Sequence, residues 1–465
     1  MRSARFSVSG LAAVVQGKES SEERMKTVGI HTLGCKLNYA ESAGVAAAFT
    51  RNGFALAVDG EHADVWIINT CSVTGSADRE CRQVIRRIRR RAPDAFIVVT
   101  GCYAQLHPEL AASLDGVDAV VGSREKGRLF ELITDFRRRD VPLVLVSPGD
   151  DTHFWGADSS GFGGRTRAFL KIQDGCDYNC SYCVIPQARG RSRSESPGAV
   201  EDRARAVVVR GYKEIVLTGV NVGDYGRTSG WSFHDLLCRL EEIEGLRRLR
   251  ISSIEPNLLT DEILQLASRS SRIAPHFHIP LQSGSNSVLG RMRRRYRKEF
   301  YRDRVDAVLS HLPQAGIGVD VIVGFPGETV DEFEETHRFL SELPASYFHV
   351  FSYSERENTP AAAMGRVVPV EERARRSAML RMLGAEKKKQ FALKFVGSVL
   401  PVLLESDYSK DGAAMFGLAP NYLRVRVDAD AALENEIVPV VIDGYSGGAA
   451  CGWLQKREGE KGRES

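Results

Sequence analysis

The chain has 465 residues, of which 43% are hydrophobic and 26% are charged, and its formal net charge is +3. This composition is ordinary for a globular protein, so we expect neither a wholly disordered chain nor dependence on disulfides. The near-neutral charge excludes nucleic-acid binding by global charge alone. The length predicts more than one domain, and no apolar run reaches the roughly 18 residues of a membrane-spanning helix. We predict that residues 1–25 form a disordered extension, with Met25 as an alternative start. We also predict that the protein is cytoplasmic.

Residues 26–140 alternate apolar strands with helices, which predicts an N-terminal doubly wound α/β domain with a parallel sheet covered on both faces. The expected strands are 26–33, 63–69, 95–100 and 117–121, and the expected helices are 38–51 and 78–91. Residues 141–164, which are rich in Gly, Ser and Asp from Asp150 onward, predict a linker.

The same alternation resumes over residues 165–393 with longer intervals between strands. The expected strands are 168–172, 214–217, 248–252, 276–279, 318–323 and 347–352, and the expected helices include 261–267 and 331–343. Six strand–helix units are too few for a closed eight-stranded barrel, so they predict a partial (βα)6 barrel of the TIM type.

Residues 394–458 show short alternating strands separated by turn residues, with no helical pattern between them. The expected strands are 397–404, 413–418, 421–428 and 437–443. This pattern predicts a small antiparallel, OB-like β-barrel, a common size for nucleic-acid-binding domains, followed by a tail at 459–465.

Three cysteines, Cys176, Cys180 and Cys183, are spaced C-x-x-x-C-x-x-C directly after the first strand of the central segment. Both a closed zinc site and an iron–sulfur cubane normally take four ligands, and no fourth Cys or His lies nearby. An iron without a protein ligand can bind a small molecule, and loops after barrel strands are where chemistry takes place. The alternative is a structural zinc site that takes a remote fourth ligand.

A second set, Cys35, Cys71 and Cys102, looks scattered, but each residue follows the end of a predicted parallel strand. The carboxyl ends of neighbouring strands share one crevice, so we expect these three thiols to converge on one site. Taken alone, three buried cysteines are more often packing residues. The remaining thiols have no such spacing and are predicted to be ordinary core or surface residues: Cys81, Cys238 and Cys451.

The three-cysteine loop after the first barrel strand resembles the radical S-adenosylmethionine superfamily. The resemblance implies that Cys176, Cys180 and Cys183 hold a [4Fe-4S] cluster whose open iron is chelated by the amino and carboxylate groups of S-adenosylmethionine. One-electron reduction then releases a 5′-deoxyadenosyl radical. The resemblance also places six residues in the cofactor pocket, the first of them beside the adenine: Tyr182, Gly219, Asn221, Gln282, Ser283 and Gly324.

Motifs spread over residues 26–455 resemble the methylthiotransferase family more specifically. They are TLGCKLNYAES (Thr32–Ser42), INTCSVT (Ile68–Thr74), FLKIQDGC (Phe169–Cys176), ARGRSRS (Ala188–Ser194), IVLTGVN (Ile215–Asn221) and DVIVGFPGET (Asp320–Thr329). The resemblance implies a methylthiotransferase domain at 26–140, a radical core at 165–393 and a TRAM domain at 394–458. It also implies a second [4Fe-4S] cluster on Cys35, Cys71 and Cys102 that carries the sulfur, and a second S-adenosylmethionine that supplies the methyl group.

Three details resemble the branch that acts on N6-threonylcarbamoyladenosine in tRNA: Lys36 after Cys35, Ser-Val-Thr after Cys71, and the KIQDGC entry to the radical site. This implies methylthio insertion at C2 of that nucleoside at position 37, giving 2-methylthio-N6-threonylcarbamoyladenosine. Two alternatives with the same chemistry act on isopentenyladenosine in tRNA or on a ribosomal protein aspartate. A non-catalytic iron–sulfur sensor that binds RNA is a third alternative.

We expect local groups of basic residues to contact the anticodon loop of tRNA. Each of the first two groups below, taken alone, is at least as well explained as a solvent-exposed face of a helix. The groups are a helical set (Arg82, Arg86, Arg89 and Arg90), a run in the central segment (Arg291, Arg293, Arg294, Arg295, Arg297 and Lys298) and a terminal strand (Tyr422, Arg424 and Arg426). An electron donor and a sulfur source are the other expected partners, and the sequence identifies neither.

Overall fold

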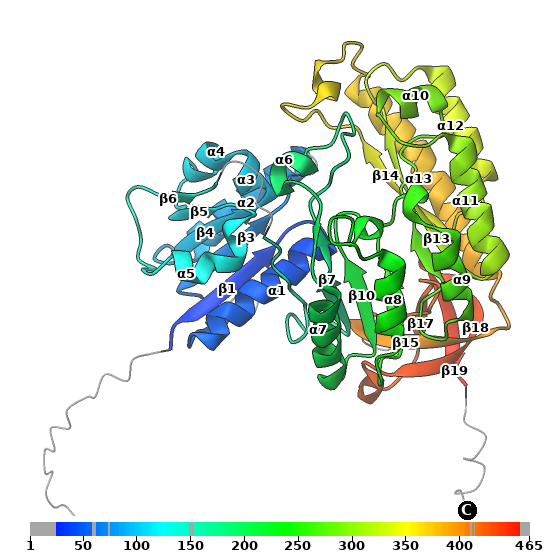
Figure 1. The fold of residues 1–465 in the computed structure, drawn as a ribbon, viewed down its shortest axis with the longest axis horizontal. Helices are drawn as coiled ribbons and strands as arrows, with labels where there is room; N and C mark the ends of the chain where they lie inside the picture. The colour runs from blue at the N-terminus through cyan, green and yellow to red at the C-terminus, as the bar shows by residue number, and fades with distance from the viewer. Residues whose placement is uncertain are drawn as a thin grey trace, which may run out of the picture.

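The computed structural model describes residues 25–57, 62–72, 75–147, 153–409, 412 and 414–455. Three parts follow one another along the chain in Figure 1: a sheet domain in blue and cyan, a half-barrel in green and yellow, and a small barrel in orange and red. The predicted extension before Met25 and the predicted tail at 459–465 lie outside the described residues. Within the described part of the chain, no helix combines the length and apolar character needed to span a bilayer.

The first part is a wholly parallel, six-stranded sheet in the order β2-β1-β3-β4-β5-β6. The strands are β1 (Thr27–Thr32), β2 (Ala55–Leu56), β3 (Val65–Thr70), β4 (Phe96–Gly101), β5 (Ala119–Val121) and β6 (Leu143–Leu145). The helices are α1 (Lys36–Arg51), α2 (Gly75–Arg91), α3 (Cys102–Leu106), α4 (Pro108–Ala112) and α5 (Leu129–Leu132). Every residue of β3 and β4 is buried, as central strands covered on both faces require, so the predicted parallel α/β architecture is confirmed.

Two strands of this sheet were not expected, because β2 and β6 are only two and three residues long. Strand β6 pairs in parallel with β5 and lies within residues 141–164, the segment predicted to be a linker. The sheet therefore extends beyond residue 140.

The central part is an open half-barrel of six parallel strands in two hydrogen-bonded sheets, β11-β10-β7 and β12-β13-β14. Single parallel bridges, Leu249 to Ile273 and Ser253 to His278, join the two sheets into one curved wall. The strands are β7 (Arg167–Lys171), β10 (Glu214–Thr218), β11 (Arg248–Ile251), β12 (His276–His278), β13 (Gly316–Val323) and β14 (Tyr347–Ser352). The predicted partial barrel of six strands is confirmed.

Helices cover the outer face of this wall, where they share one apolar core with alternate strand residues such as Val319 and Val321. These helices are α7 (Pro197–Val209), α8 (Phe233–Glu241), α9 (Asp261–Arg269), α11 (Lys298–His311), α12 (Val330–Glu342) and α13 (Val370–Leu393). Because side chains alternate along a strand, Asp320 of β13 lies on the opposite, inner face of the wall. Shorter elements near the strand ends are β8 (Gln173–Asp174), β9 (Arg193–Ser194), α6 (Ile185–Arg189) and α10 (Asn286–Arg291).

The last part is a closed barrel with strand order β15-β16-β17-β19-β18. The strands are β15 (Val399–Tyr408), β16 (Met415–Leu418), β17 (Arg424–Val427), β18 (Ile437–Ser446) and β19 (Ala449–Leu454). The sequence predicted the first four and missed β19, whose residues Ala-Ala-Cys-Gly lack the β-branched alternation of a strand. Strand β19 closes the barrel through a parallel pair with β17, so the expected fully antiparallel pairing is wrong at this one place.

The barrel is held against the half-barrel by two buried arginines of β11. Arg248 donates to the carbonyl oxygens of Leu418 and Pro401 at 3.0 and 2.8 Å, and Arg250 donates to the carbonyl of Pro420 at 2.7 Å. The loop between β16 and β17 therefore lies at the amino-terminal ends of the half-barrel strands.

Candidate functional site

The first cysteine set lies at the carboxyl ends of three adjacent strands. Cys35 follows β1 and caps α1, Cys71 directly follows β3, and Cys102 directly follows β4. Gly34 allows the close approach, since its φ is +95° and a Cβ there would lie 2.8 Å from the Sγ of Cys71. The structure thus gathers three strand ends that are far apart in sequence at one edge of the sheet, as the prediction required.

The second cysteine set lies in the loop after β8, and backbone hydrogen bonds fix that loop. The amide of Cys176 donates to the carbonyl of Gly190 at 3.1 Å, and the amide of Cys183 donates to the carbonyl of Cys180 at 3.1 Å. Burial raises the pKa of Cys176 to about 11 and that of Cys183 to about 12. These thiols therefore remain protonated at neutral pH until a metal displaces their protons.

The spacing of the sulfurs argues against a single zinc ion. In a tetrahedral site with Zn–S distances of about 2.3 Å, two sulfurs lie about 3.8 Å apart. Among the residues that the structure describes, neither cysteine set brings its three sulfurs within 4.8 Å of one another. Thiolate-only donors held farther apart fit a larger iron–sulfur cluster, and three thiolates leave one of its irons without a protein ligand.

One buried arginine binds the central thiol of the second set. The Nη1 atom of Arg294 donates to the Sγ of Cys180 at 3.2 Å, and the same guanidinium pairs with Glu255. It also lies 3.5 Å from the hydroxyl of Tyr182, the residue predicted beside the adenine. This contact places a cation beside the sulfur of Cys180.

Two of the other predicted cofactor residues, Gly219 and Asn221, lie just past the end of β10. A Cβ at Gly219 would lie 2.8 Å from the side-chain oxygen of Gln173, so the backbone approaches this side chain closely. Asn221 is buried, and neither atom of its amide has a hydrogen-bond partner among the residues that the structure describes. Buried polar atoms are normally satisfied, so Asn221 is a good candidate for binding a ligand.

Local structure accounts for the remaining three predicted cofactor residues. Gln282 has a positive φ of 73°, and its amide donates to the carbonyl of Asp320 at 2.8 Å. The hydroxyl of Ser283 bonds to that of Thr336 at 3.1 Å, and the amide of Gly324 donates to Glu328 at 2.6 Å. These contacts shape the loops after β12 and β13, whatever the loops bind.

The inner face of the half-barrel carries a polar group that the sequence did not reveal. The Nε2 of His278 lies 2.9 Å from Asp320 Oδ1, and the Nδ1 of His349 lies 3.2 Å from the same oxygen. Although burial opposes ionisation, the two histidines hold the pKa of Asp320 well below its usual range. The available signal was the alternation along β12, β13 and β14, because these residues occupy positions opposite the core-facing ones.

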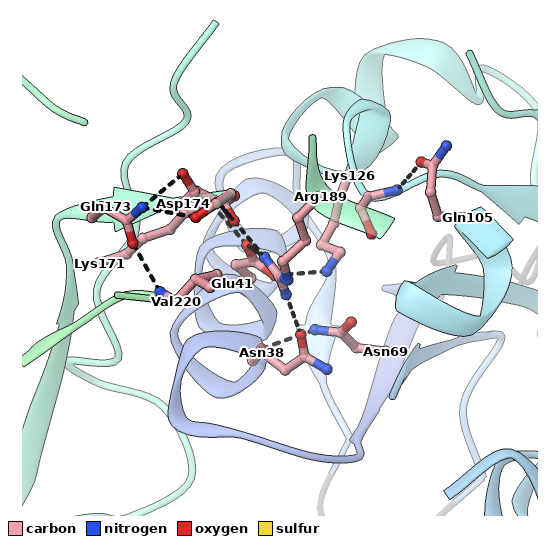
Figure 2. Close-up of polar contacts among 12 residues, drawn as sticks. Asn38, Glu41, Asn69, Gln105, Lys126, Lys171, Gln173, Asp174, Arg189 and Val220 are labelled. Atoms are coloured by element: carbon pink, nitrogen blue, oxygen red, sulfur yellow. Dashed lines mark hydrogen bonds and ion pairs between the residues drawn. The ribbon is translucent and has the colours of Figure 1, made fainter. Parts of the chain in front are cut away.

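A buried ionic network joins the two cysteine-bearing domains (Figure 2). Glu41 of α1 accepts from Lys126 and from Lys171 at 2.7 Å each, and from Arg189 at 2.9 Å. Arg189 also pairs with Asp174 at 3.0 Å. Although burial opposes ionisation, the Arg189, Lys126 and Lys171 charges hold the pKa of Glu41 well below its usual range.

This network lies between the two cysteine sets. The Nη2 of Arg189 donates to the side-chain oxygen of Asn38 at 2.6 Å, three residues after Cys35, while Asp174 stands two residues before Cys176. Helix α6, which follows the second cysteine set and ends at Arg189, packs against α3, which begins at Cys102. The network therefore fixes the position of one set relative to the other.

Replacing Glu41 by Gln is expected to destabilise the fold by about 3–5 kcal/mol, because Lys126, Lys171 and Arg189 lose a buried counter-charge. The folded-state pKa is depressed, so this contribution is present above the unfolded carboxyl pKa of about 4.3 and is lost as the pH falls below it. Denaturant unfolding of both proteins at neutral and acidic pH measures the difference.

The control is Glu201→Gln, which removes a partly exposed surface carboxylate that pairs with Arg205 and Arg239 and should cost less than about 1 kcal/mol. An equally small loss for Glu41→Gln at neutral pH would contradict the role given to the network.

Part of the predicted RNA-binding surface is occupied by contacts within the chain. Arg89 pairs with the buried Asp118, Arg291 pairs with Glu332, and Lys298 pairs with Glu335. The side chain of Arg294 is buried against Glu255 and Cys180, so the prediction is wrong for this residue, and it stays a prediction for the other three. Exposed members of the two sets, among them Arg86 and Arg90 on α2, remain candidates.

The prediction is also wrong for Tyr422, which was placed on a strand with Arg424 and Arg426. Strand β17 begins at Arg424, and Tyr422 precedes it with a positive φ of 68°. Its ring stacks on His276 of the half-barrel at a centroid distance of 4.3 Å. Tyr422 therefore faces the half-barrel, and only the two arginines face outward.

Comparison with known proteins agrees with this geometry. Residues 170–340 match the radical SAM superfamily, and residues 27–122 match the family described as "Uncharacterized protein family UPF0004". A solved radical S-adenosylmethionine methyltransferase, TsrM from Kitasatospora setae, shares the fold with a TM-score of 0.53 and 18% identity, over 72% of this chain and 75% of that one. The half-barrel and its three-cysteine loop define a radical S-adenosylmethionine protein.

The relatives of this chain identify one family within this class. The chain is 42% identical to the threonylcarbamoyladenosine tRNA methylthiotransferase MtaB of Bacillus subtilis (strain 168), over 90% of this chain and 94% of that protein. It is 37% identical to the protein of the same name from Aquifex aeolicus (strain VF5), over 81% and 92%. The chain belongs to the MtaB family of methylthiotransferases, which confirms the resemblance in its motifs. A tRNA-2-methylthio-N(6)-dimethylallyladenosine synthase from Desulfosudis oleivorans (strain DSM 6200 / JCM 39069 / Hxd3) is 35% identical over 83% and 84%.

Proposed function

We propose that this protein inserts a methylthio group at C2 of N6-threonylcarbamoyladenosine at position 37 of tRNA, giving 2-methylthio-N6-threonylcarbamoyladenosine. The observation that carries the proposal is the pairing of two three-cysteine sets on facing domains, with a buried ionic network between them. An aromatic C–H bond is neither acidic nor electrophilic enough for polar catalysis. Two open thiolate sites therefore fit this reaction better than a single site would.

In this proposal Cys176, Cys180 and Cys183 hold one [4Fe-4S] cluster, and a second is held by Cys35, Cys71 and Cys102. When bound, the two clusters and S-adenosylmethionine supply the radical and the transferable sulfur. Three other side chains prepare the first of these sites: Arg294 donates to the sulfur of Cys180, Tyr182 supplies an aromatic surface, and Asn221 offers a buried amide without a partner among the described residues.

The RNA substrate is supported by the closed terminal barrel and by exposed arginines on α2 and β17. Phosphate contacts of this kind give an affinity that falls with salt concentration. The target adenosine stands in an unpaired loop, so it can enter the half-barrel without the melting of a helix. We place the reaction in the cytoplasm and expect an external electron donor and an external sulfur source.

The proposal is tested by offering the anaerobically reconstituted protein three substrates in parallel: tRNA with N6-threonylcarbamoyladenosine, tRNA with isopentenyladenosine, and ribosomal protein. Mass spectrometry should detect a methylthio group on the first alone. Modification of either of the others in its place would reject the assignment. Release of 5′-deoxyadenosine under dithionite separates an enzyme from an RNA-binding sensor, which would release none.

A further inference from the structure

The floor of the half-barrel is formed by an aromatic stack from two domains. Tyr422, from the terminal barrel, lies on His276 of β12, and the ring of Tyr347 on β14 lies 5.9 Å from that of Tyr422. The hydroxyl of Tyr347 lies 2.9 Å from the Nε2 of His276. This stack closes the half-barrel at the amino-terminal ends of its strands.

Lys36, the residue after Cys35, reaches this floor from the sheet domain. Its ammonium lies 5.8 Å from the centroid of the Tyr422 ring. In the described part of the chain, no carboxylate lies within ion-pair distance of it, and no acceptor is hydrogen-bonded to it. The side chain therefore presents an unpaired cation to the inside of the half-barrel, next to a proposed cluster ligand.

The charges around Lys36 favour an anion. Two arginines, Arg167 and Arg250, lie beside it, and a third, Arg248, lies beside these two. The nearby carboxylates, Glu214 and Glu405, already pair with these arginines, so four cations face two acids. A bound anion would bring this excess of positive charge closer to balance.

Two buried polar atoms in the same place also have no partner. The Nη1 of Arg167 and the Nδ1 of His276 are both buried, and neither has a hydrogen bond to any residue in the described ranges. The guanidinium of Arg167 lies 5.9 Å from the Tyr422 ring, so it borders the same space as Lys36. Buried polar atoms of this kind are normally satisfied, and one ligand with several polar atoms would satisfy them together.

We propose that Lys36 and Arg167 bind the carboxylate of the threonylcarbamoyl group, and that His276 bonds a polar atom of the same group. This inference rests on the proposed function and names the residues that set its specificity. The threonylcarbamoyl group ends in a carboxylate and also carries a hydroxyl and a urea, whereas an isopentenyl group offers no acceptor. A floor with an unpaired cation and unused polar atoms selects the first and leaves the second with nothing to bond.

The test uses two anticodon stem-loop RNAs that differ at one position, carrying either N6-threonylcarbamoyladenosine or its neutral carboxamide analogue. Reconstituted wild-type protein should bind the carboxylate RNA about 10- to 100-fold more tightly, the worth of one charge-assisted hydrogen bond. The two RNAs have the same backbone, so contacts to the backbone cancel in the ratio of their two affinities. Equal affinity of the wild-type protein for the two RNAs would overturn the inference without any variant.

Three variants test whether Lys36 causes the preference for the carboxylate RNA. Lys36→Gln should lower the affinity ratio to within about threefold of unity and raise KM more than it lowers kcat, with unchanged iron content. Lys36→Arg should keep most of the preference, and Lys26→Gln, which removes an exposed lysine at the other end of β1, should keep all of it. A Lys36→Gln protein with the wild-type ratio would refute the role of Lys36. Failure of the wild-type protein to methylthiolate the carboxylate RNA would instead refute the proposed function itself.

Discussion

Replacing Cys180 by Ala is expected to stop the reductive cleavage of S-adenosylmethionine. Cys180 is the buried central member of its set, and it alone accepts the hydrogen bond from Arg294 at 3.2 Å. Its loss leaves two protein ligands for the cluster. We expect release of 5′-deoxyadenosine under dithionite to fall by at least about a hundredfold, since loss of groups that merely support a ligand already costs 10- to 100-fold.

The matched control is Cys238→Ala, on the outer helix α8. Cys238 contacts only the ring of His234, at 3.8 Å, among the polar groups that the structure describes, so its loss should leave cleavage at the wild-type rate. A Cys180→Ala protein that still releases 5′-deoxyadenosine at that rate would remove Cys180 from the ligand set.

Replacing Cys71 by Ala is expected to separate two reactions that the unchanged protein performs together. Cys71 lies in the sheet domain, whereas the loop of the radical site is held by its own hydrogen bonds to Gly190 and Met292. Cleavage of S-adenosylmethionine should therefore persist, while formation of the methylthio nucleoside falls by at least about a hundredfold. Both products are measured in one anaerobic reaction.

A neighbouring cysteine supplies the control for this variant. Cys81 on α2 donates its thiol to the carbonyl of Cys71 at 3.4 Å, and burial raises its pKa to about 12. It is thus a protonated packing residue, and Cys81→Ala should form product normally. Normal product formation by Cys71→Ala, or its loss from Cys81→Ala with intact folding, would show that the sulfur-carrying site is wrongly assigned.

The cysteine sets and the domain order could be predicted because they depend on local patterns. An apolar run marks each central strand, and Cys71 and Cys102 stand where two such runs end. The half-barrel was likewise predictable from the number of strand–helix units. Strand β19 was not, because its sequence is a weak strand former and only its neighbours in the closed barrel select that conformation.

The polar parts of the site depend on contacts between distant residues, which periodicity does not encode. Glu41 lies 85 residues from Lys126 and 148 from Arg189, and each of the three alone reads as an exposed charge. The same limit applies to Arg291 and Lys298, whose acidic partners on α12 the basic run does not reveal. A run of basic residues in the sequence does not show which of its side chains pair with acidic residues in the fold.

The most direct test of the whole account is the metal content of the anaerobically reconstituted protein, determined by iron and sulfide analysis together with Mössbauer spectroscopy. Two [4Fe-4S] clusters predict about eight irons per chain, with one subset of irons altered when S-adenosylmethionine is added. A single cluster with about four irons, or zinc in place of iron, would contradict the account.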